Sequence, residues 1–266
     1  MKIIGEKING TRKRVNQAIT ERDADFIKNL AQKQAEAGAA WLDVNAGTHP
    51  NREADDLIWL IETIQAVVDT PLCLDSANPQ ALAVAIKAVN KTPLINSISG
   101  EPERLDGILP LVVEHGCQVI ALAMAAKKIP ETVEGRVEVI EMLIEKTRGA
   151  GVPDKDVYVD PLAMTISTNI QSGMVTCDII RTIHEAYPEV HFTLGLSNIS
   201  FGLPARSYIN RAFLTLAMAA GLDSAILDPL DRELQATILA AQLVLGQDRH
   251  CLQYTRAYRA GVFSSS

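Results

Sequence analysis

Cysteine is scarce in this chain of 266 residues, and its spacing excludes two classes of small, cross-linked protein. The four cysteines lie far apart and form no Cys-x-x-Cys pair, so neither a disulfide framework nor a zinc ribbon is expected. The neighbouring His250 and Cys251 supply only one pair of side chains, whereas a zinc site needs three or four protein ligands. The sequence therefore predicts buried, reduced thiols and no bound metal.

Long apolar runs and an excess of positive charge are absent as well. No apolar run reaches the roughly 18 residues that a membrane-spanning helix needs, and the first residues, MKIIGEKING, lack the apolar core of a signal peptide. The formal net charge of −7 argues against nucleic acid as the main partner. These absences predict a cytoplasmic protein with neither a membrane nor a nucleic-acid partner.

No linker divides the chain. Stretches rich in proline, serine or glycine are missing, and so are low-complexity blocks, so residues 1–266 are interpreted as one domain. Hydrophobic residues make up 47% of the sequence and can supply a substantial core. The final GVFSSS is expected to fray.

Strand patterns alternate with helical patterns along the whole chain. Strands are predicted at 2–8, 41–46, 71–75, 93–98, 119–124, 157–161, 191–197 and 224–228. Helices are predicted at 25–37, 55–68, 79–89, 105–115, 133–149, 176–186, 209–220 and 231–245. The expected helix boundaries are Asp25 and Thr176 as N-caps, Pro79 in a first turn, and Gly38, Gly116 and Gly221 as C-caps.

Eight strand–helix units in about 250 residues match an α/β fold of the (β/α)8, or TIM, barrel type. A doubly wound parallel sheet is the alternative. It is disfavoured because no glycine fingerprint of a dinucleotide-binding turn follows the first strand.

Polar residues stand where the predicted strands end. An Asp or Asn meets the carboxyl end of an apolar run in LDVNAG at 42–47, LCLDSAN at 72–78, LINSIS at 94–99, VYVDPL at 157–162, HFTLGLSNIS at 191–200 and ILDPL at 226–230. Such groups are costly in a core, and parallel sheets bind ligands beyond the carboxyl ends of their strands. We therefore expect a polar-lined pocket on one rim of the barrel.

Several of these polar residues carry a structural interpretation beside a functional one. Asp43 and Asn45 share a face and look into the barrel if Leu42 and Val44 face the helices. The carboxylates of Asp75 and Asp160 form either an acid–base pair or acceptors for a ligand with several N–H donors. At the first strand, Glu6 and Asn9 either join the pocket or belong to a salt-bridged rim. Asp228 is either a helix cap or salt-bridge partner, or a site residue. Arg206 either binds an anionic group of the ligand or holds its own loop in place.

Together the motifs resemble one family. GEKING at 5–10, LDVNAG, LCLDSAN, INS at 95–97, DPL at 160–162, GLSNIS and INR at 209–211 resemble the methyltetrahydrofolate:corrinoid methyltransferases. These are pterin-binding barrels related to the folate module of cobalamin-dependent methionine synthase. The resemblance runs in order from Met1 to about Leu245.

The resemblance implies specific roles. Asp75, Asn96 and Asp160 would hold the pterin ring, since a carboxylate can accept hydrogen bonds from the 2-amino group and the adjacent ring N–H. Asn198 would stabilise a proton at N5, with Gly195 and Ser197 orienting its loop. Because an amide does not titrate, water or a network that includes the rim carboxylates must deliver that proton.

The fifth strand departs from the family pattern. A polar residue is expected after Met124, which is placed at the pocket, but Ala125 and Ala126 stand there. Lys127 or Lys128 either meets the glutamate tail of the folate or is solvated, and the second interpretation is preferred.

The resemblance also implies partners. The substrate would be tetrahydrofolate or 5-methyltetrahydrofolate, the second reactant a cobalamin-type corrinoid on a separate corrinoid protein, and the assembly a homodimer. The methyl group would move to the corrinoid, or from it to tetrahydrofolate as in the second methyltransferase of a demethylase system. One alternative is a dihydropteroate synthase-like enzyme, which needs a basic pyrophosphate site where 224–232 is acidic. The other is a folate-binding protein without chemistry.

Overall fold

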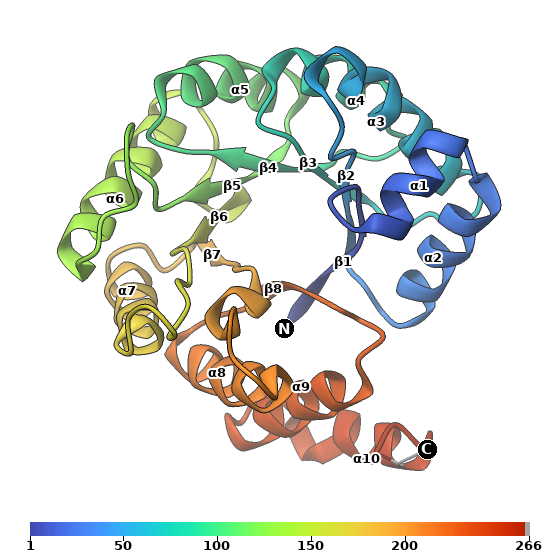
Figure 1. The fold of residues 1–266 in the computed structure, drawn as a ribbon. Helices are drawn as coiled ribbons and strands as arrows, with labels where there is room; N and C mark the ends of the chain where they lie inside the picture. Colours follow the sequence, from blue (N-terminus) through green and yellow to red (C-terminus); the bar gives the residue numbers. More distant parts are fainter. Residues whose placement is uncertain (264–266) are drawn as a thin grey trace.

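Eight parallel strands form the inner wall of the molecule in the computed structural model, which describes residues 1–263 (Figure 1). They are β1 (Lys2–Asn9), β2 (Trp41–Asn45), β3 (Leu72–Asp75), β4 (Leu94–Ile98), β5 (Gln118–Leu122), β6 (Val157–Asp160), β7 (His191–Phe192) and β8 (Ser224–Leu227). Their order in the sheet is β7-β6-β5-β4-β3-β2-β1-β8, and every neighbouring pair runs parallel. Each strand thus pairs with its neighbours in sequence, as a barrel requires.

The barrel closes between β7 and β8. The backbone N–H of Ile226 donates to the carbonyl of Leu194 at 2.9 Å, and Ser224 Oγ donates to the carbonyl of Phe192 at 2.8 Å. Gly195 also forms an isolated parallel bridge with Ile226. The predicted (β/α)8 barrel is confirmed, and the doubly wound alternative is excluded because an open sheet leaves these edges unpaired.

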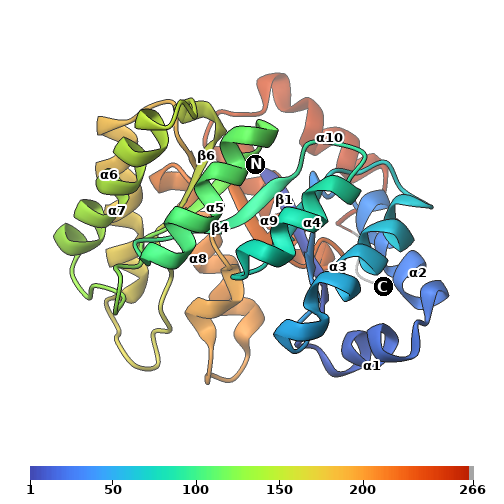
Figure 2. The ribbon, with the colours of Figure 1, turned by 90° about the horizontal axis from the view of Figure 1, so that it is seen from above.

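Helices surround the barrel, as the view along its axis and the view turned by 90° show (Figures 1 and 2). They are α1 (Lys13–Glu21), α2 (Ala24–Glu36), α3 (Pro50–Gln65), α4 (Pro79–Ala88), α5 (Pro102–His115), α6 (Val133–Gly149), α7 (Ser172–Ala186), α8 (Arg206–Ala220), α9 (Arg232–Val244) and α10 (Leu252–Arg259). Short 3₁₀ turns cover Asp154–Asp156, Leu196–Ser200 and Arg249–Cys251. No helix within residues 1–263 has the length and apolarity that crossing a membrane requires.

Strand alternation divides the apolar side chains into two cores. The larger core lies between strands and helices and contains Leu42 and Val44. The smaller core fills the barrel with Ile4, Trp41, Cys73, Leu94, Ile120 and Tyr158. Since Leu42 and Val44 face the helices, the alternate residues of β2 face the barrel interior, as the sequence analysis predicted.

Seven strands lie within two residues of their predicted bounds, whereas the seventh is much shorter. The ladder of β7 ends at Phe192, and residues 196–200 form a turn in which the Asn198 N–H donates to the Gly195 carbonyl at 3.2 Å. A local hydrogen bond of this kind competes with strand pairing. The polar end of the predicted strand is therefore a loop.

The sequence analysis did not predict two of the helices, α1 and α10. Helix α1 buries Val15, Ala18 and Ile19 on one face, but it has only nine residues and no side-chain cap. Helix α10 lies in the tail, has only eight residues and buries none of them.

Several smaller predictions also need adjustment. The N-cap of α2 is Asp23, which accepts from Phe26 N, instead of Asp25. Thr176 lies inside α7, where its hydroxyl donates to the Ser172 carbonyl, so it is not an N-cap. Gly38 lies one residue beyond the C-cap of α2, whereas Pro79, Gly116 and Gly221 occupy their predicted positions.

The four cysteines are free, and three of them are buried. Cys251 is exposed, so the prediction of burial was wrong there, because the segment around it packs loosely on the barrel. Of the GVFSSS tail, residues 264–266 lie outside the described residues.

Candidate active site

The carboxyl ends of β2, β3 and β4 bring polar side chains together inside the barrel. Asp75 and Asn96 are register partners on adjacent strands. Asn45 reaches across from β2, and its Nδ2 donates to Asp75 Oδ2 at 2.8 Å. Burial raises the pKa of Asp75, while the hydrogen bond from Asn45 and the charge of Arg104 lower it. The structure thus gathers these predicted residues into one cluster.

Asp43 lies deeper, one inward position below Asn45, and only 2% of its surface is exposed. Its Oδ1 has no hydrogen-bond partner within the described residues. Burial raises the pKa of Asp43 well above its usual range, and the nearby Asp75 raises it further, although hydrogen bonds with Cys73 and Asn96 oppose the change. A buried acceptor is costly without a donor, so Asp43 Oδ1 is a candidate for a hydrogen bond from water or from a ligand.

Asp160 ends β6 on the other side of the barrel mouth and is 6% exposed. Its Oδ1 accepts a 2.7 Å hydrogen bond from the backbone N–H of Leu162. Burial raises the pKa of Asp160 to about 7, against the opposing effects of that N–H and of the Arg136 charge. The carboxyl group therefore titrates near neutral pH.

The loop after β7 carries Asn198 at the exposed edge of the same face. A Cβ on Gly195 would lie 2.9 Å from Asn198 Nδ2, so a larger residue there would displace the amide. Arg206 donates from Nη2 to the carbonyl of Ser197 at 2.5 Å and from Nε to Ser200 Oγ at 3.0 Å. Arg206 thus holds its own loop in place through hydrogen bonds, which is one of its two predicted roles.

The end of β1 contributes ion pairs to the rim. Glu6 pairs with Arg12 at 2.6 Å, and burial raises the pKa of Glu6 against that charge. Lys7 pairs with Asp228, whose Oδ1 also accepts from Leu230 N at 2.9 Å. These contacts match the salt-bridged interpretation of the rim.

Asn9 and Met124 lie at the same end, where the Asn9 side-chain oxygen and the Met124 carbonyl accept hydrogen bonds. Asn9 Oδ1 accepts from the backbone N–H of Thr11 at 3.0 Å and from its hydroxyl at 2.6 Å. The Met124 carbonyl accepts from Gly100 N at 2.8 Å, which joins the loops after β4 and β5. Lys127 and Lys128 are exposed, consistent with the solvated interpretation.

The sequence matches a protein family described as pterin binding enzyme over residues 5–228. The chain belongs to the pterin-binding enzymes. A relative in Eubacterium limosum named methylcorrinoid:tetrahydrofolate methyltransferase is 42% identical, over 98% of this chain and 97% of its own length. Methionine synthase of Mycobacterium leprae is 34% identical over 84% of this chain, which corresponds to 20% of that protein.

Solved structures share the barrel of this pterin-binding enzyme. Dihydropteroate synthase from Xanthomonas albilineans, in complex with 7,8-dihydropteroate, has a TM-score of 0.67 and 20% identity over 92% of each chain. Dihydropteroate synthase from Coxiella burnetii, in complex with pteroic acid, has a TM-score of 0.70 and 16% identity over 93% of each chain. At these identities the likeness concerns the fold alone.

Two arginines beside the carboxylates were missed by the sequence analysis of this pterin-binding enzyme. Arg104 on α5 lowers the pKa of Asp75, and Arg136 on α6 lowers that of Asp160. Both belong to helices, so a search of strand ends does not find them. Arg104 also lines a groove of about 850 Å³ beside the rim, formed by the loops after β3, β4 and β5.

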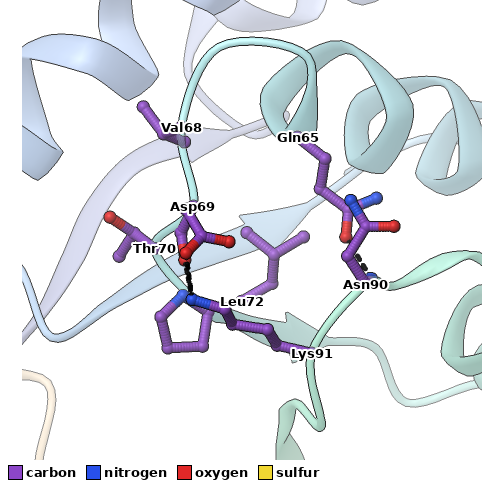
Figure 3. Close-up of a pocket in the computed structure, with 8 residues that line it drawn as sticks. Gln65, Val68, Asp69, Thr70, Leu72, Asn90 and Lys91 are labelled. Carbon is purple, nitrogen blue, oxygen red and sulfur yellow. Dashed lines mark hydrogen bonds and ion pairs between the residues drawn. The ribbon is translucent and has the colours of Figure 1, made fainter.

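One small cavity lies at the opposite end of the barrel. A cavity at the amino end of β3, between Gln65 and Lys91, measures about 10 Å³, which is room for about one water molecule (Figure 3). Its polar groups are paired: Lys91 contacts Asp69, and Gln65 Oε1 accepts from Asn90 N. No cluster of three metal-ligating side chains occurs in the part of the chain that is described.

Proposed function

We propose that this pterin-binding enzyme transfers a methyl group between N5 of tetrahydrofolate and the cobalt of a corrinoid carried by a partner protein. The observation that carries the proposal is the ring of inward carboxylates and amides at the carboxyl ends of β2, β3, β4 and β6. It is supported by the relative in Eubacterium limosum, which matches nearly the whole chain and is named for this reaction. That name also supports the direction from methylcorrinoid to tetrahydrofolate.

In this proposal Asp75, Asn96 and Asp160 hold the pterin ring. The 2-amino group and ring N–H supply further donors to the buried carboxylates, while Asn96 offers both a donor and an acceptor. The unpartnered Oδ1 of Asp43 fits a ligand, or a water molecule held with it, that brings further donors. Binding would thereby offset the cost of burying carboxylates without partners.

Asn198 acts at N5 in the proposed reaction. The cobalt supplies the methyl-transfer chemistry, so the protein's task is orientation and electrostatic stabilisation. When N5 attacks the methyl group of the methylcorrinoid, the N–C bond forms, the cobalt–carbon bond breaks and N5 gains positive charge; in the reverse direction the positive N5 is the better leaving group. An amide oxygen stabilises that charge in both directions as it develops in the transition state. Asn198 lies on the exposed loop after β7, where a ligand seated over the carboxylates also meets a docking corrinoid protein.

The dihydropteroate synthase alternative has less support. Its solved members share 16–20% identity with this chain, against 42% for the methyltransferase. Asp228, in the acidic stretch 224–232, is paired with Lys7, which leaves that lysine engaged instead of free for a pyrophosphate. Homodimer formation, a single domain and a cytoplasmic location stay predictions; sedimentation of the purified protein tests the first.

A spectral assay tests the proposed reaction in both directions. The purified protein is mixed with methylcobalamin and tetrahydrofolate, and the formation of cob(I)alamin is followed by its absorbance. The reverse mixture contains cob(I)alamin and 5-methyltetrahydrofolate. Enzyme-dependent turnover supports the proposal. Folate binding without turnover, even when methylated corrinoid proteins are supplied, would favour the non-catalytic alternative, and absence of folate binding would refute both.

A further inference from the structure

Arg136 is a buried cation that contacts only backbone carbonyl groups. It lies in the first turn of α6 and is 4% exposed. Its Nε donates to the Pro130 carbonyl at 2.7 Å, and its Nη1 donates to the carbonyls of Pro161 at 2.9 Å and Leu162 at 2.7 Å. None of the ion pairs found in residues 1–263 includes Arg136. Its planar fork joins the loop before α6 to the loop after β6.

The loop after β6 contains a residue with a strained backbone, and the hydrogen bonds from Arg136 help to hold it. Leu162 has a φ of 58°, a left-handed conformation that is unfavourable for a residue other than glycine. Its carbonyl is held by Arg136, and its N–H donates to Asp160 Oδ1 at 2.7 Å. The two backbone groups of one strained residue therefore connect the guanidinium to the carboxylate.

We propose that Arg136 is the positioning residue for Asp160: by holding the carbonyls of Pro161 and Leu162, it aims the Leu162 N–H at the carboxylate and keeps that carboxylate turned toward the pterin. This inference rests on the proposed function, in which Asp160 binds the pterin ring. In this inference Arg136 acts on the folate through Asp160, since its Nε and Nη1 donate to the three loop carbonyls.

The charge of Arg136 adds a second effect. The pKa of Asp160 responds to burial, to the Leu162 N–H and to the Arg136 charge, and the last two favour the carboxylate. Because the proposed contact to the pterin needs the carboxylate form, loss of the positive charge moves the pH at which folate binding appears upward.

The test compares variants on the two ends of one helix. Arg136→Met removes charge and fork, Arg136→Lys keeps only the charge, and Arg148→Met is the matched control. Arg148 lies in the last turn of α6 and pairs with Asp154 at 2.8 and 2.6 Å, far along the helix from Asp160. Calorimetry measures the Kd for tetrahydrofolate from acidic to alkaline pH, and thermal unfolding measures stability.

We expect Arg136→Met to raise the Kd about 10- to 100-fold at neutral pH and to shift the pH midpoint of binding upward. Arg136→Lys should raise the Kd less and leave the midpoint near that of the wild type, since an ammonium keeps the charge but cannot reproduce the fork. Arg148→Met should lower the Tm with both binding values unchanged.

Wild-type Kd and midpoint in a folded Arg136→Met variant would overturn the proposal. If Arg136→Met does not fold, the Arg136→Lys variant tests the proposal. A Kd for tetrahydrofolate equal to that of Arg148→Met would then overturn it, because it would show that the guanidinium fork does not position Asp160. A wild-type protein that fails to bind tetrahydrofolate would instead refute the proposed function, so the two failures are distinguishable.

Discussion

Polar side chains at the amino ends of the strands are paired with one another, whereas at the carboxyl ends Asp43 Oδ1 has no partner among the described residues. At the amino end, Lys2 Nζ donates to the Tyr158 hydroxyl at 2.9 Å, and His191 stacks on the Tyr158 ring at 4.7 Å between centroids. His191 also contacts Asp223, which accepts from Phe192 N at 2.8 Å. This layer is self-sufficient.

At the carboxyl end, three inward carboxyl groups belong to Asp43, Asp75 and Asp160, and burial raises the pKa of each. Their local donors are few, and Asp43 Oδ1 has none within the described residues. Two polar layers of one barrel thus differ: the paired layer stabilises the fold, and in the proposed function the carboxyl-end layer receives donors from a ligand. Substitutions in the two layers should therefore change the free energy of unfolding in opposite directions.

The largest effect is expected at Asn198. Asn198→Ala should slow methyl transfer about 10- to 1000-fold while leaving the Kd for tetrahydrofolate nearly unchanged, because the amide is proposed to act when charge develops at N5. Single-turnover kinetics with methylcobalamin measure the first quantity, and calorimetry the second. Ser207→Ala, on an exposed serine at the start of α8, is the control. Full activity of Asn198→Ala would remove the loop from the reaction.

The next largest effect concerns binding. Asp160→Asn removes the charge that is proposed to accept the pterin N–H groups, and the Kd for tetrahydrofolate should rise about 10- to 100-fold at alkaline pH. Asp228→Asn is the matched control, since this second strand-end carboxylate is already paired with Lys7. Equal losses in both variants would mean that the rim carboxylates act through net charge alone.

The same variant should be more stable than the wild type. Burial raises the pKa of Asp160 to about 7, whereas an unfolded aspartate titrates near 4. The folded state thus binds the proton more tightly, so this group's contribution is complete below about pH 4 and is lost as the pH rises through about 7. Asparagine avoids that loss.

Above pH 7, Asp160→Asn should therefore raise the free energy of unfolding of the ligand-free protein by roughly 1–3 kcal/mol. The difference should fade toward acidic pH. Urea denaturation at a series of pH values measures it, and parallel curves for the two proteins would show that Asp160 does not carry this cost.

Much of this arrangement is predictable from the sequence because strand periodicity is simple. Alternation on β2 places Asp43 and Asn45 inward once Leu42 and Val44 are assigned to the outer core, and the structure agrees. A β-branched apolar run followed by Asp or Asn marks a strand end without any knowledge of contacts. The barrel and its polar rim follow from repeating that pattern.

The features that the sequence does not predict depend on contacts between segments that lie far apart in the chain. Arg136 lies on a helix, and only the folded chain shows that its guanidinium reaches the carbonyls after β6. The two interpretations of Arg206 and of Asp228 are likewise separated by partners that spacing does not reveal. The early end of β7 was missed because the apolar run continues through Leu194 although its ladder stops at Phe192.

The smallest expected effect tests the paired layer. Tyr158→Phe removes the hydroxyl that accepts from Lys2 Nζ but keeps the ring, which stacks on His191 and meets Trp41 edge-on at 5.7 Å. The free energy of unfolding should fall by about 1 kcal/mol, because a partly buried donor loses its acceptor. The Kd for tetrahydrofolate should not change.

Tyr158 and Asp160 are two residues apart on β6 and both point into the barrel. Each substitution deletes one polar function from the same strand, so strand propensity and barrel geometry are matched between them. Opposite signs in the free energy of unfolding above pH 7 would therefore come from the surroundings of the two groups, because the Tyr158 hydroxyl accepts from Lys2 Nζ, whereas burial raises the pKa of Asp160 despite its bond from the Leu162 N–H. If both variants are less stable than the wild type, the polar groups of the carboxyl-end layer are as well paired as those of the amino-end layer. That outcome would remove this support for a ligand site at the carboxyl end.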